Sequence, residues 1–257
     1  MVLGICNLSV VPLRSDPSHR SEMVNQVLFA EIFELLEERS EWTYIRMLES
    51  DYEGWLQHGQ YRIWGGEIPS FDDDAYRVVD CSGAEAISDQ NSIRLVPGTK
   101  IWDTLSLTLP NSSPAPYHIQ GGLRNPTVAD FAMELPKLVN LYHACPYLWG
   151  GRSPYGLDCS GLTQAIYAQF GITLRRDAYQ QAEQGRTVDF VAEIKPGDLA
   201  FFDNEEGRIT HVGLMLDADR IFHASAYVRT DNMDSEGIFN PSEGRYTHKL
   251  RIVKRIL

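Results

Sequence analysis

The sequence predicts an α+β chain in which two small all-β units precede a domain built from a helix packed on an antiparallel sheet. Three observations lead to this prediction. Before residue 127, short apolar runs alternate with clusters of Ser, Asp, Pro and Gly. An apolar helical stripe follows Cys159, and further on a strand–turn–strand pattern carries two histidines. A chain of 257 residues is long enough for two or three units of ordinary size.

The first unit is predicted as a small all-β barrel over residues 1–65. Its strand-like runs are separated by turn-forming residues and lie at 8–13, 27–33, 42–48 and 52–57.

A second all-β unit with its linker is predicted over residues 66–126. Its expected strands lie at 76–80, 84–87, 93–96 and 99–107, with Pro97-Gly98 as a turn. A segment rich in Pro and Ser at 110–116 is expected to lead into the last unit, residues 127–257.

A short buried helix is predicted directly after Cys159. Its apolar residues are spaced i, i+3, i+4 and i+8, namely Leu162, Ala165, Ile166 and Phe170, and Gly171 is the expected stop. Cys159 then lies at or near the N-cap. Unpaired N–H groups and the positive end of the helix dipole favour a thiolate there, which makes this cysteine the candidate nucleophile.

A hairpin is predicted downstream, because residues 211–216 and 221–224 are apolar and residues 217–220 are polar and turn-prone. It carries His211 on one strand and His223 on the other. The two side chains should be neighbours across the antiparallel pair, through adjacent or diagonal positions. His211 is then the expected base for Cys159, and His223 the residue that orients it.

These motifs resemble the NlpC/p60 cysteine peptidases over about residues 127–257. Four stretches carry the resemblance in the family's order: 147–162, 195–199, 211–213 and 223–225. The resemblance implies a papain-like fold, a triad of Cys159, His211 and His223, and hydrolysis of cell-wall peptides after γ-D-glutamate without a cofactor. It also pairs Tyr147 with a family tyrosine twelve residues before the nucleophile, a candidate for the oxyanion site beside the Cys159 N–H.

The first unit resembles a bacterial SH3-like domain at residues 10–35 and 42–57, and the second unit does so weakly. For family members that cleave free cell-wall peptides, the resemblance implies that the first SH3-like domain closes the cleft, so that only a peptide with a free N-terminal L-alanine fits. The matching ligand-contact positions are Glu31, Tyr52, Asp158, Ser160, Asp177 and Ala178.

Such carboxylates would pair with the ammonium group of a free peptide and discriminate against a blocked one. Ala178 stands where some members have serine, so only its backbone is expected to bind. A plainer interpretation stays open, in which Glu31 is an exposed strand residue, Tyr52 is core and Asp177 makes a surface salt bridge beside Arg175-Arg176.

The remaining cysteines, Cys6, Cys81 and Cys145, are interpreted as small apolar residues, and the histidines at 19, 58, 118, 143 and 248 are given no role. The chain has no Cys-x-x-Cys or His-x-x-x-His spacing, so no metal is expected. With 23 Lys and Arg against 35 Asp and Glu, the net charge of −12 argues against nucleic acid or an anionic membrane as partner.

The expected location is the cytoplasm, because the N-terminus has no visible signal pattern and no run reaches transmembrane length; a removed leader would change this to export. The leading hypothesis is a peptidase that releases L-Ala-γ-D-Glu from recycled murein peptides. Two alternatives remain: a secreted endopeptidase acting on intact wall, and a wall-binding protein with an inactive peptidase domain. The sequence leaves open the diamino acid, meso-diaminopimelate or lysine, and the oligomeric state.

Overall fold

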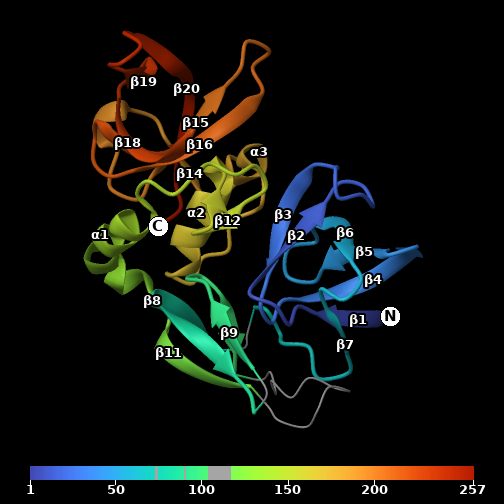
Figure 1. Ribbon diagram of the computed structural model, residues 1–257. Coiled ribbons are helices and arrows are strands. Elements are labelled where there is room, and N and C mark those ends of the chain that lie inside the picture. Colours follow the sequence, from blue (N-terminus) through green and yellow to red (C-terminus); the bar gives the residue numbers. More distant parts are fainter. Residues whose placement is uncertain (73–74, 90, 104–116) are drawn as a thin grey trace.

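The structure is a computed structural model that describes residues 1–72, 75–89, 91–103 and 117–257. It holds three parts that follow one another along the chain (Figure 1). Strands are the main regular structure of the described chain, with a few short helices, so the predicted α+β class is confirmed. No helix in these ranges is long and apolar enough to cross a membrane.

The first part is a seven-stranded antiparallel sheet in the order β3-β2-β6-β5-β4-β1-β7. Its strands are β1 (Val2–Ile5), β2 (Val10–Arg14), β3 (Met23–Leu28), β4 (Ile32–Arg39), β5 (Trp42–Met47), β6 (Glu53–Gln57) and β7 (Arg62–Trp64). Alternate residues of β2 and β5 are buried, as period-two patterning requires. They enclose a core that includes Val11, Leu13, Phe33 and Ile45.

The predicted strand at 27–33 is corrected by the structure. The run covers the end of β3, a tight turn in which Ala30 has φ of 67°, and the start of β4. It appears continuous in sequence because the turn is also buried: Phe29 and Ala30 pack on the core of the second part. A buried turn therefore has the apolar composition of a strand.

The second part is a smaller sheet of β8 (Tyr76–Ile87), β9 (Ser92–Leu95), β10 (Lys100–Trp102) and β11 (His118–Arg124). β8 is one strand where the sequence predicted two; Gly83, with φ of 75°, lies within it near a register shift opposite Gly121. Its core is shared with the first part, since Ile5 and Trp64 cluster with Val79. The predicted segment 110–116 and the end of the run at 99–107 lie outside the described residues.

The third part contains a second seven-stranded sheet, in the order β14-β20-β15-β16-β17-β18-β19. Its strands are β14 (Arg186–Val188), β15 (Leu199–Asp203), β16 (Ile209–Met215), β17 (Arg220–Ser225), β18 (Tyr227–Met233), β19 (Gly237–Asn240) and β20 (Arg245–Arg255). Because β19 also pairs with β20, six of these strands close into a barrel.

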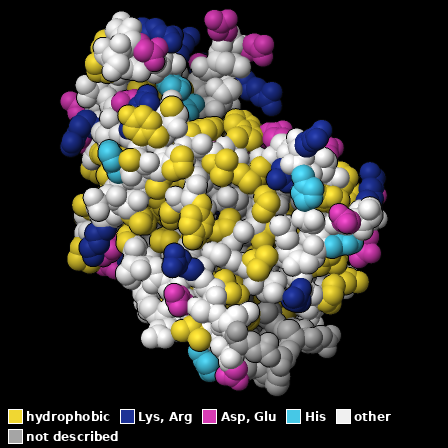
Figure 2. Space-filling view, viewed as in Figure 1, with side chains coloured by type: hydrophobic (Ala, Val, Ile, Leu, Met, Phe, Trp, Pro, Cys, Tyr) yellow, Lys and Arg dark blue, Asp and Glu magenta, His cyan; other side chains and the backbone are white. Residues whose placement is uncertain are grey.

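Helices cover one side of this barrel: α1 (Phe131–Tyr142), α2 (Cys159–Ala168) and α3 (Ala178–Gln181), with short 3-10 turns η1 (Val128–Asp130) and η2 (Val191–Glu193). Helix α2 packs on β16 and β17, and the hairpin of β12 (Arg152–Ser153) and β13 (Gly156–Leu157) leads into it. Figure 2 shows the whole molecule from the same side as Figure 1: hydrophobic side chains gather in the middle of this view, and most charged side chains lie toward its edge.

Candidate active site

Cys159 is the first residue of α2, as the apolar stripe predicted, and Asp158 is the N-cap. The Asp158 carboxylate accepts a hydrogen bond of 2.7 Å from the Gly161 N–H, which satisfies one of the free donors of the first turn. The thiol lies against strand β16, where the Val212 backbone hydrogen bonds to it. Val212 directly follows His211 in β16, so the packing of α2 on this strand places the Cys159 thiol beside the backbone next to the candidate base.

The predicted hairpin is formed by β16 and β17, with Leu214 opposite Phe222 and Met215 opposite Ile221. The two histidines interact as predicted, with 2.8 Å between His211 Nε2 and His223 Nδ1. Gly213 makes this approach possible, because a Cβ at this position would lie 2.9 Å from the His223 Cβ and 2.6 Å from the Ile221 Cδ1.

Asp231 on β18 extends this pair, and sequence reasoning missed it. Its carboxylate lies 3.0 Å from His223 Nε2 and also accepts a 2.8 Å hydrogen bond from Arg229 Nε. Although burial alone would raise it, the hydrogen bonds from His223 and Arg229 hold the pKa of Asp231 below its ordinary value. The group is therefore an anion that can only accept.

This chain of contacts fixes the tautomers. Since Asp231 only accepts, His223 carries its proton on Nε2, and its neutral Nδ1 must accept from His211 Nε2. The Nδ1 of His211 is then the nitrogen left without a proton. The chain of Arg229, Asp231 and His223 thus leaves a basic nitrogen on His211 for the thiol.

The charge state of the pair differs from the sequence expectation of a thiolate. Burial raises the pKa of Cys159 to about 12, the Asp158 charge adds to the effect, and backbone hydrogen bonds from Val212 and Ser160 only partly oppose it. Burial also lowers the pKa of His211 well below its ordinary value, with His223 and His248 contributing. Both groups are neutral at rest, because the loss of hydration on burial outweighs the stabilisation of a thiolate by the N-terminus of α2.

His248 was given no role from the sequence, and the structure places it beside the candidate base. It lies on β20, with its ring centroid 4.3 Å from that of His211. The two residues are 37 positions apart in the sequence (248 − 211), and only barrel closure brings them together.

A cavity of about 630 Å³ opens beside Cys159 and is lined by both the first and the third parts of the molecule. Seven of the predicted residues line it: Tyr52, Tyr147, Asp158, Cys159, Ser160, Asp177 and Ala178. Other lining residues, not singled out in the sequence, include Glu22, Val24, Trp149, Arg176 and Arg208. His211 and His223 are buried and are not among the residues that line this cavity.

Glu31 is not among the lining residues, contrary to the sequence expectation. Its carboxylate forms an ion pair with Arg152 and accepts a 2.8 Å hydrogen bond from the Leu28 N–H. Glu22 is the carboxylate that the first part contributes to the cavity, and the Trp149 indole N–H donates to it at 2.5 Å. Glu22 directly precedes the edge strand β3, and no local pattern shows that this edge faces the third part of the chain.

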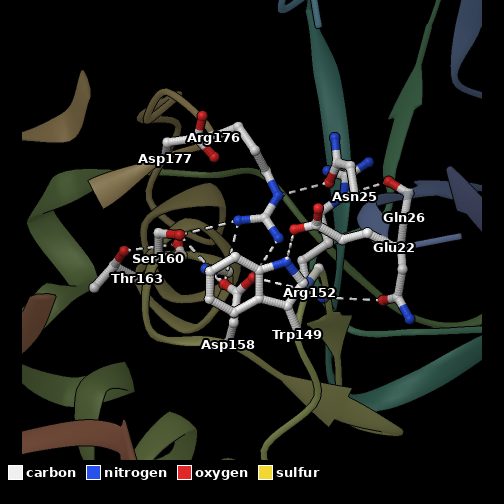
Figure 3. A network of polar contacts seen from close by, with 12 residues as sticks. Glu22, Asn25, Gln26, Trp149, Arg152, Asp158, Ser160, Thr163, Arg176 and Asp177 are labelled. Atoms are coloured by element: carbon white, nitrogen blue, oxygen red, sulfur yellow. Dashed lines mark hydrogen bonds and ion pairs between the residues drawn. The ribbon is translucent and has the colours of Figure 1, made fainter. Parts of the chain in front are cut away.

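The buried Arg176 joins the two parts (Figure 3). Its Nε donates to Asn25 Oδ1 on β3 at 2.9 Å, and its Nη1 donates to Ser160 Oγ at 2.9 Å. Its Nη2 lies 2.5 Å from Asp158 Oδ2, which also accepts from the Gly150 N–H at 2.9 Å. Asp158 therefore caps α2 and pairs with Arg176, so it is not free to bind an ammonium group as expected.

Tyr52 and Asp177 meet across the cavity from opposite parts of the chain. Burial raises the pKa of Asp177, Arg176 opposes this, and a hydrogen bond from Tyr52 also favours the anion. Burial raises the pKa of Tyr52 to about 12, so its hydroxyl stays a donor. Burial likewise raises the pKa of Tyr147, with the Cys159 thiol adding to it.

The fold and this site define a class of protein that comparison with known families identifies. Residues 144–244 match the NlpC/P60 family, and residues 13–60 match the bacterial dipeptidyl-peptidase Sh3 domain. The chain therefore contains an NlpC/P60 domain, the domain of a cysteine peptidase family, and a bacterial dipeptidyl-peptidase SH3 domain. This confirms both resemblances found in the sequence.

Two named relatives and one solved structure are similar to this chain over different shares of its length. The chain is 44% identical over 81 residues to the gamma-D-glutamyl-L-lysine dipeptidyl-peptidase of Bacillus subtilis, which is 31% of this chain and 27% of that protein. It is 26% identical over 246 residues to dipeptidyl-peptidase 6 of Lysinibacillus sphaericus, covering 87% of this chain and 88% of the relative. The fold is that of an NlpC/P60 family protein from Bacillus cereus, with a TM-score of 0.77, 20% identity and 99% coverage of both chains.

Proposed function

We propose that this chain is a cysteine peptidase that cleaves the γ-D-glutamyl–diamino acid bond of cell-wall peptides whose N-terminal L-alanine is free. The product is L-Ala-γ-D-Glu. The observation that carries the proposal is that the acidic groups Glu22 and Asp177 line the same cavity as Cys159. The names of the Bacillus subtilis and Lysinibacillus sphaericus relatives agree with such a dipeptidyl-peptidase activity.

The ammonium group of the peptide is the part that the acidic end of the cavity would bind. One oxygen of Glu22 accepts from Trp149, and among the described residues no side chain pairs with the other. Asp177 and the Tyr52 hydroxyl complete an acceptor-rich wall. A blocked N-terminus brings no charge to offset the desolvation of these carboxylates, so it would bind poorly.

The reaction follows from the neutral resting pair. As the Cys159 sulfur bonds to the γ-carbonyl carbon, its proton moves to Nδ1 of His211 and the carbonyl oxygen becomes an oxyanion. The Cys159 N–H at the start of α2 and the Tyr147 hydroxyl are the proposed oxyanion donors. His211 then protonates the leaving amine, and the C–N bond breaks to give a thioester.

Water completes the cycle. Water attacks the thioester carbonyl carbon as His211 Nδ1 accepts its proton, a C–O bond forms, the C–S bond breaks, and the departing thiolate takes the proton back from His211. Throughout, His223 and Asp231 stabilise the imidazolium form of His211. A role in murein peptide recycling in the cytoplasm belongs to the same proposal, and cell fractionation tests the location.

The test compares L-Ala-γ-D-Glu-meso-diaminopimelate with the same peptide acetylated at its N-terminus, with products followed by mass spectrometry. We expect cleavage of the free peptide only, and none by a Cys159→Ala control. Equal cleavage of both peptides would overturn the ammonium pocket and favour an endopeptidase acting on intact wall. No cleavage of either would overturn the peptidase proposal.

A further inference from the structure

His248 is a buried histidine beside the proposed base that the mechanism above does not use. Its ring centroid lies 4.3 Å from that of His211, and the two planes are inclined by 31°. His223 meets His211 edge-on, at 5.1 Å and 80°. The imidazole of His211 is thus bonded at one edge by His223 and covered on one face by His248. His248 also lies outside residues 144–244, the segment that matches the NlpC/P60 family.

We propose that His248 is a positioning residue for His211, whose ring it stacks against and holds in the plane that presents Nδ1 to the Cys159 thiol. The inference rests on the proposed function, because it assigns His211 as the base. His248 itself exchanges no proton with substrate.

The position of the His248 ring is set by the barrel. Its backbone pairs with Ile238 on β19, and the following residue, Lys249, pairs with Asp203 on β15. The His248 Nδ1 and the Thr247 hydroxyl share a 2.9 Å hydrogen bond. Phe202 packs against both rings, with centroids 5.7 Å from His211 and 5.9 Å from His248. The stack is therefore held from three neighbouring strands.

The stack also keeps His211 a neutral base at rest. The His248 ring covers one face of the imidazole and excludes water from it, and burial is the largest cause of the lowered His211 pKa. Besides each other, the charged and titratable groups that act on the two rings are His223 on β17 and Arg229 and Asp231 on β18. Burial lowers the pKa of His248 to about 4, so the ring is neutral where the peptidase would work.

The test uses two substitutions that separate the ring face from the ring nitrogens. His248→Phe keeps an aromatic face, and His248→Ala removes it. We expect His248→Ala to lower kcat on the order of 10- to 100-fold with little change in KM, because the base loses its alignment. In the pH profile of kcat/KM for His248→Ala, the pKa of the acidic limb should rise toward the ordinary histidine value, because water reaches His211. His248→Phe should keep most of both properties, and the exposed His143→Ala serves as control.

Folding is checked by circular dichroism and thermal unfolding of each variant. The inference is overturned if His248→Ala matches the unsubstituted protein in kcat and pH profile, or if His248→Phe is as impaired as His248→Ala. NMR titration of the His211 ring gives a readout that needs no substrate: removal of the stack should raise its pKa. A protein that cleaves no peptide but shows this shift would sink the proposed function and leave the positioning contact intact.

Discussion

At the scale of single residues, Asp231 determines which nitrogen of His211 is free. It lies on β18, a strand beyond the hairpin that carries the histidines, and acts through His223. The Asp231 carboxylate is an anion that accepts from two donors and donates to none. Only one arrangement of protons on His223 and His211 is therefore compatible with it.

Asp231→Asn reverses this arrangement while nearly preserving its shape. The amide N–H₂ can donate to His223 Nε2, after which His223 Nδ1 donates to His211 and the proton of His211 moves to Nδ1. We expect kcat to fall on the order of 10²- to 10⁴-fold, by analogy with a triad held in the wrong tautomer. Peptide hydrolysis measures the loss, and Asp219→Asn in the exposed turn is the control. A variant with normal kcat would show that Asp231 does not set the tautomer.

The pH dependence follows from the two neutral groups. The pKa of His211 lies well below its ordinary value, so the base is unprotonated at pH 7 and is lost only as the pH falls through that lowered value. The pKa of Cys159, about 12, keeps the thiol protonated through the neutral range. We therefore expect kcat/KM to stay level well below pH 6.5 and then to fall.

Iodoacetamide labelling of Cys159 supplies the second half of this prediction. Its rate should not rise until strongly alkaline pH, because alkylation needs the thiolate. A fall in kcat/KM at the ordinary histidine pKa, or rapid labelling of Cys159 at pH 6, would contradict the prediction that His211 and Cys159 are both neutral at rest. The unfolded chain binds a proton at His211 that the folded chain does not, so stability should also decrease as the pH falls below about 6.5.

At the scale of elements, the hairpin of β16 and β17 depends on Gly213. A methyl group there would lie 2.6 Å from Ile221 Cδ1 and 2.9 Å from His223 Cβ, much closer than carbon atoms pack. The strands would have to separate where the two histidines meet.

Gly213→Ala is expected to destabilise the protein by about 1–3 kcal/mol, the usual cost of overpacking. It should also lower kcat, since the His211–His223 hydrogen bond would lengthen. Denaturant unfolding measures the first effect and peptide hydrolysis the second. Gly65→Ala is the matched control, because a Cβ there meets no atom within 4 Å. Unchanged stability and kcat in Gly213→Ala would mean that the hairpin tolerates a wider spacing.

Elements with local signals were predictable, and residues placed by distant pairing were not. The helix after Cys159 and the hairpin of His211 and His223 have patterns that a dozen residues define. Asp231 and His248 join the site only because the barrel places β18 and β20 near β16 and β17. Glu31 was predicted from a match of sequence positions and Glu22 was not singled out, because such a match does not show which side of an SH3-type sheet faces a neighbouring part of the chain.

At the scale of the whole molecule, the cavity exists because the first part docks on the third. Asn25 on β3 bonds to Arg176, and Arg152 bonds to the Gln26 side chain and backbone at 2.9 and 2.8 Å. Gly150 lies so close to the Met23 carbonyl that any side chain would separate the two parts. The acidic wall and the thiol are therefore held in a fixed relation.

Glu22→Gln tests the selectivity that this docking would create. It keeps the shape and removes the charge that would pair with the ammonium group, a contact of about 1.5–3 kcal/mol. We expect kcat/KM for the free peptide to fall about 10- to 100-fold, with a smaller effect on the acetylated peptide. Glu31→Gln is the informative comparison: it should lower thermal stability through Arg152 without changing the ratio of the two substrates. If Glu31→Gln changed the ratio instead, the acidic wall would be assigned to the wrong carboxylate.

The shared cavity also defines a route to selective inhibition. A short compound with a primary amine at one end and a nitrile at the other would place the amine at Glu22 and form a reversible thioimidate with Cys159. A peptidase without the first part of this chain would have no Glu22 to hold the amine. The potency gained from the amine would therefore depend on the first part being docked beside Cys159. A compound without the amine would lose this selectivity.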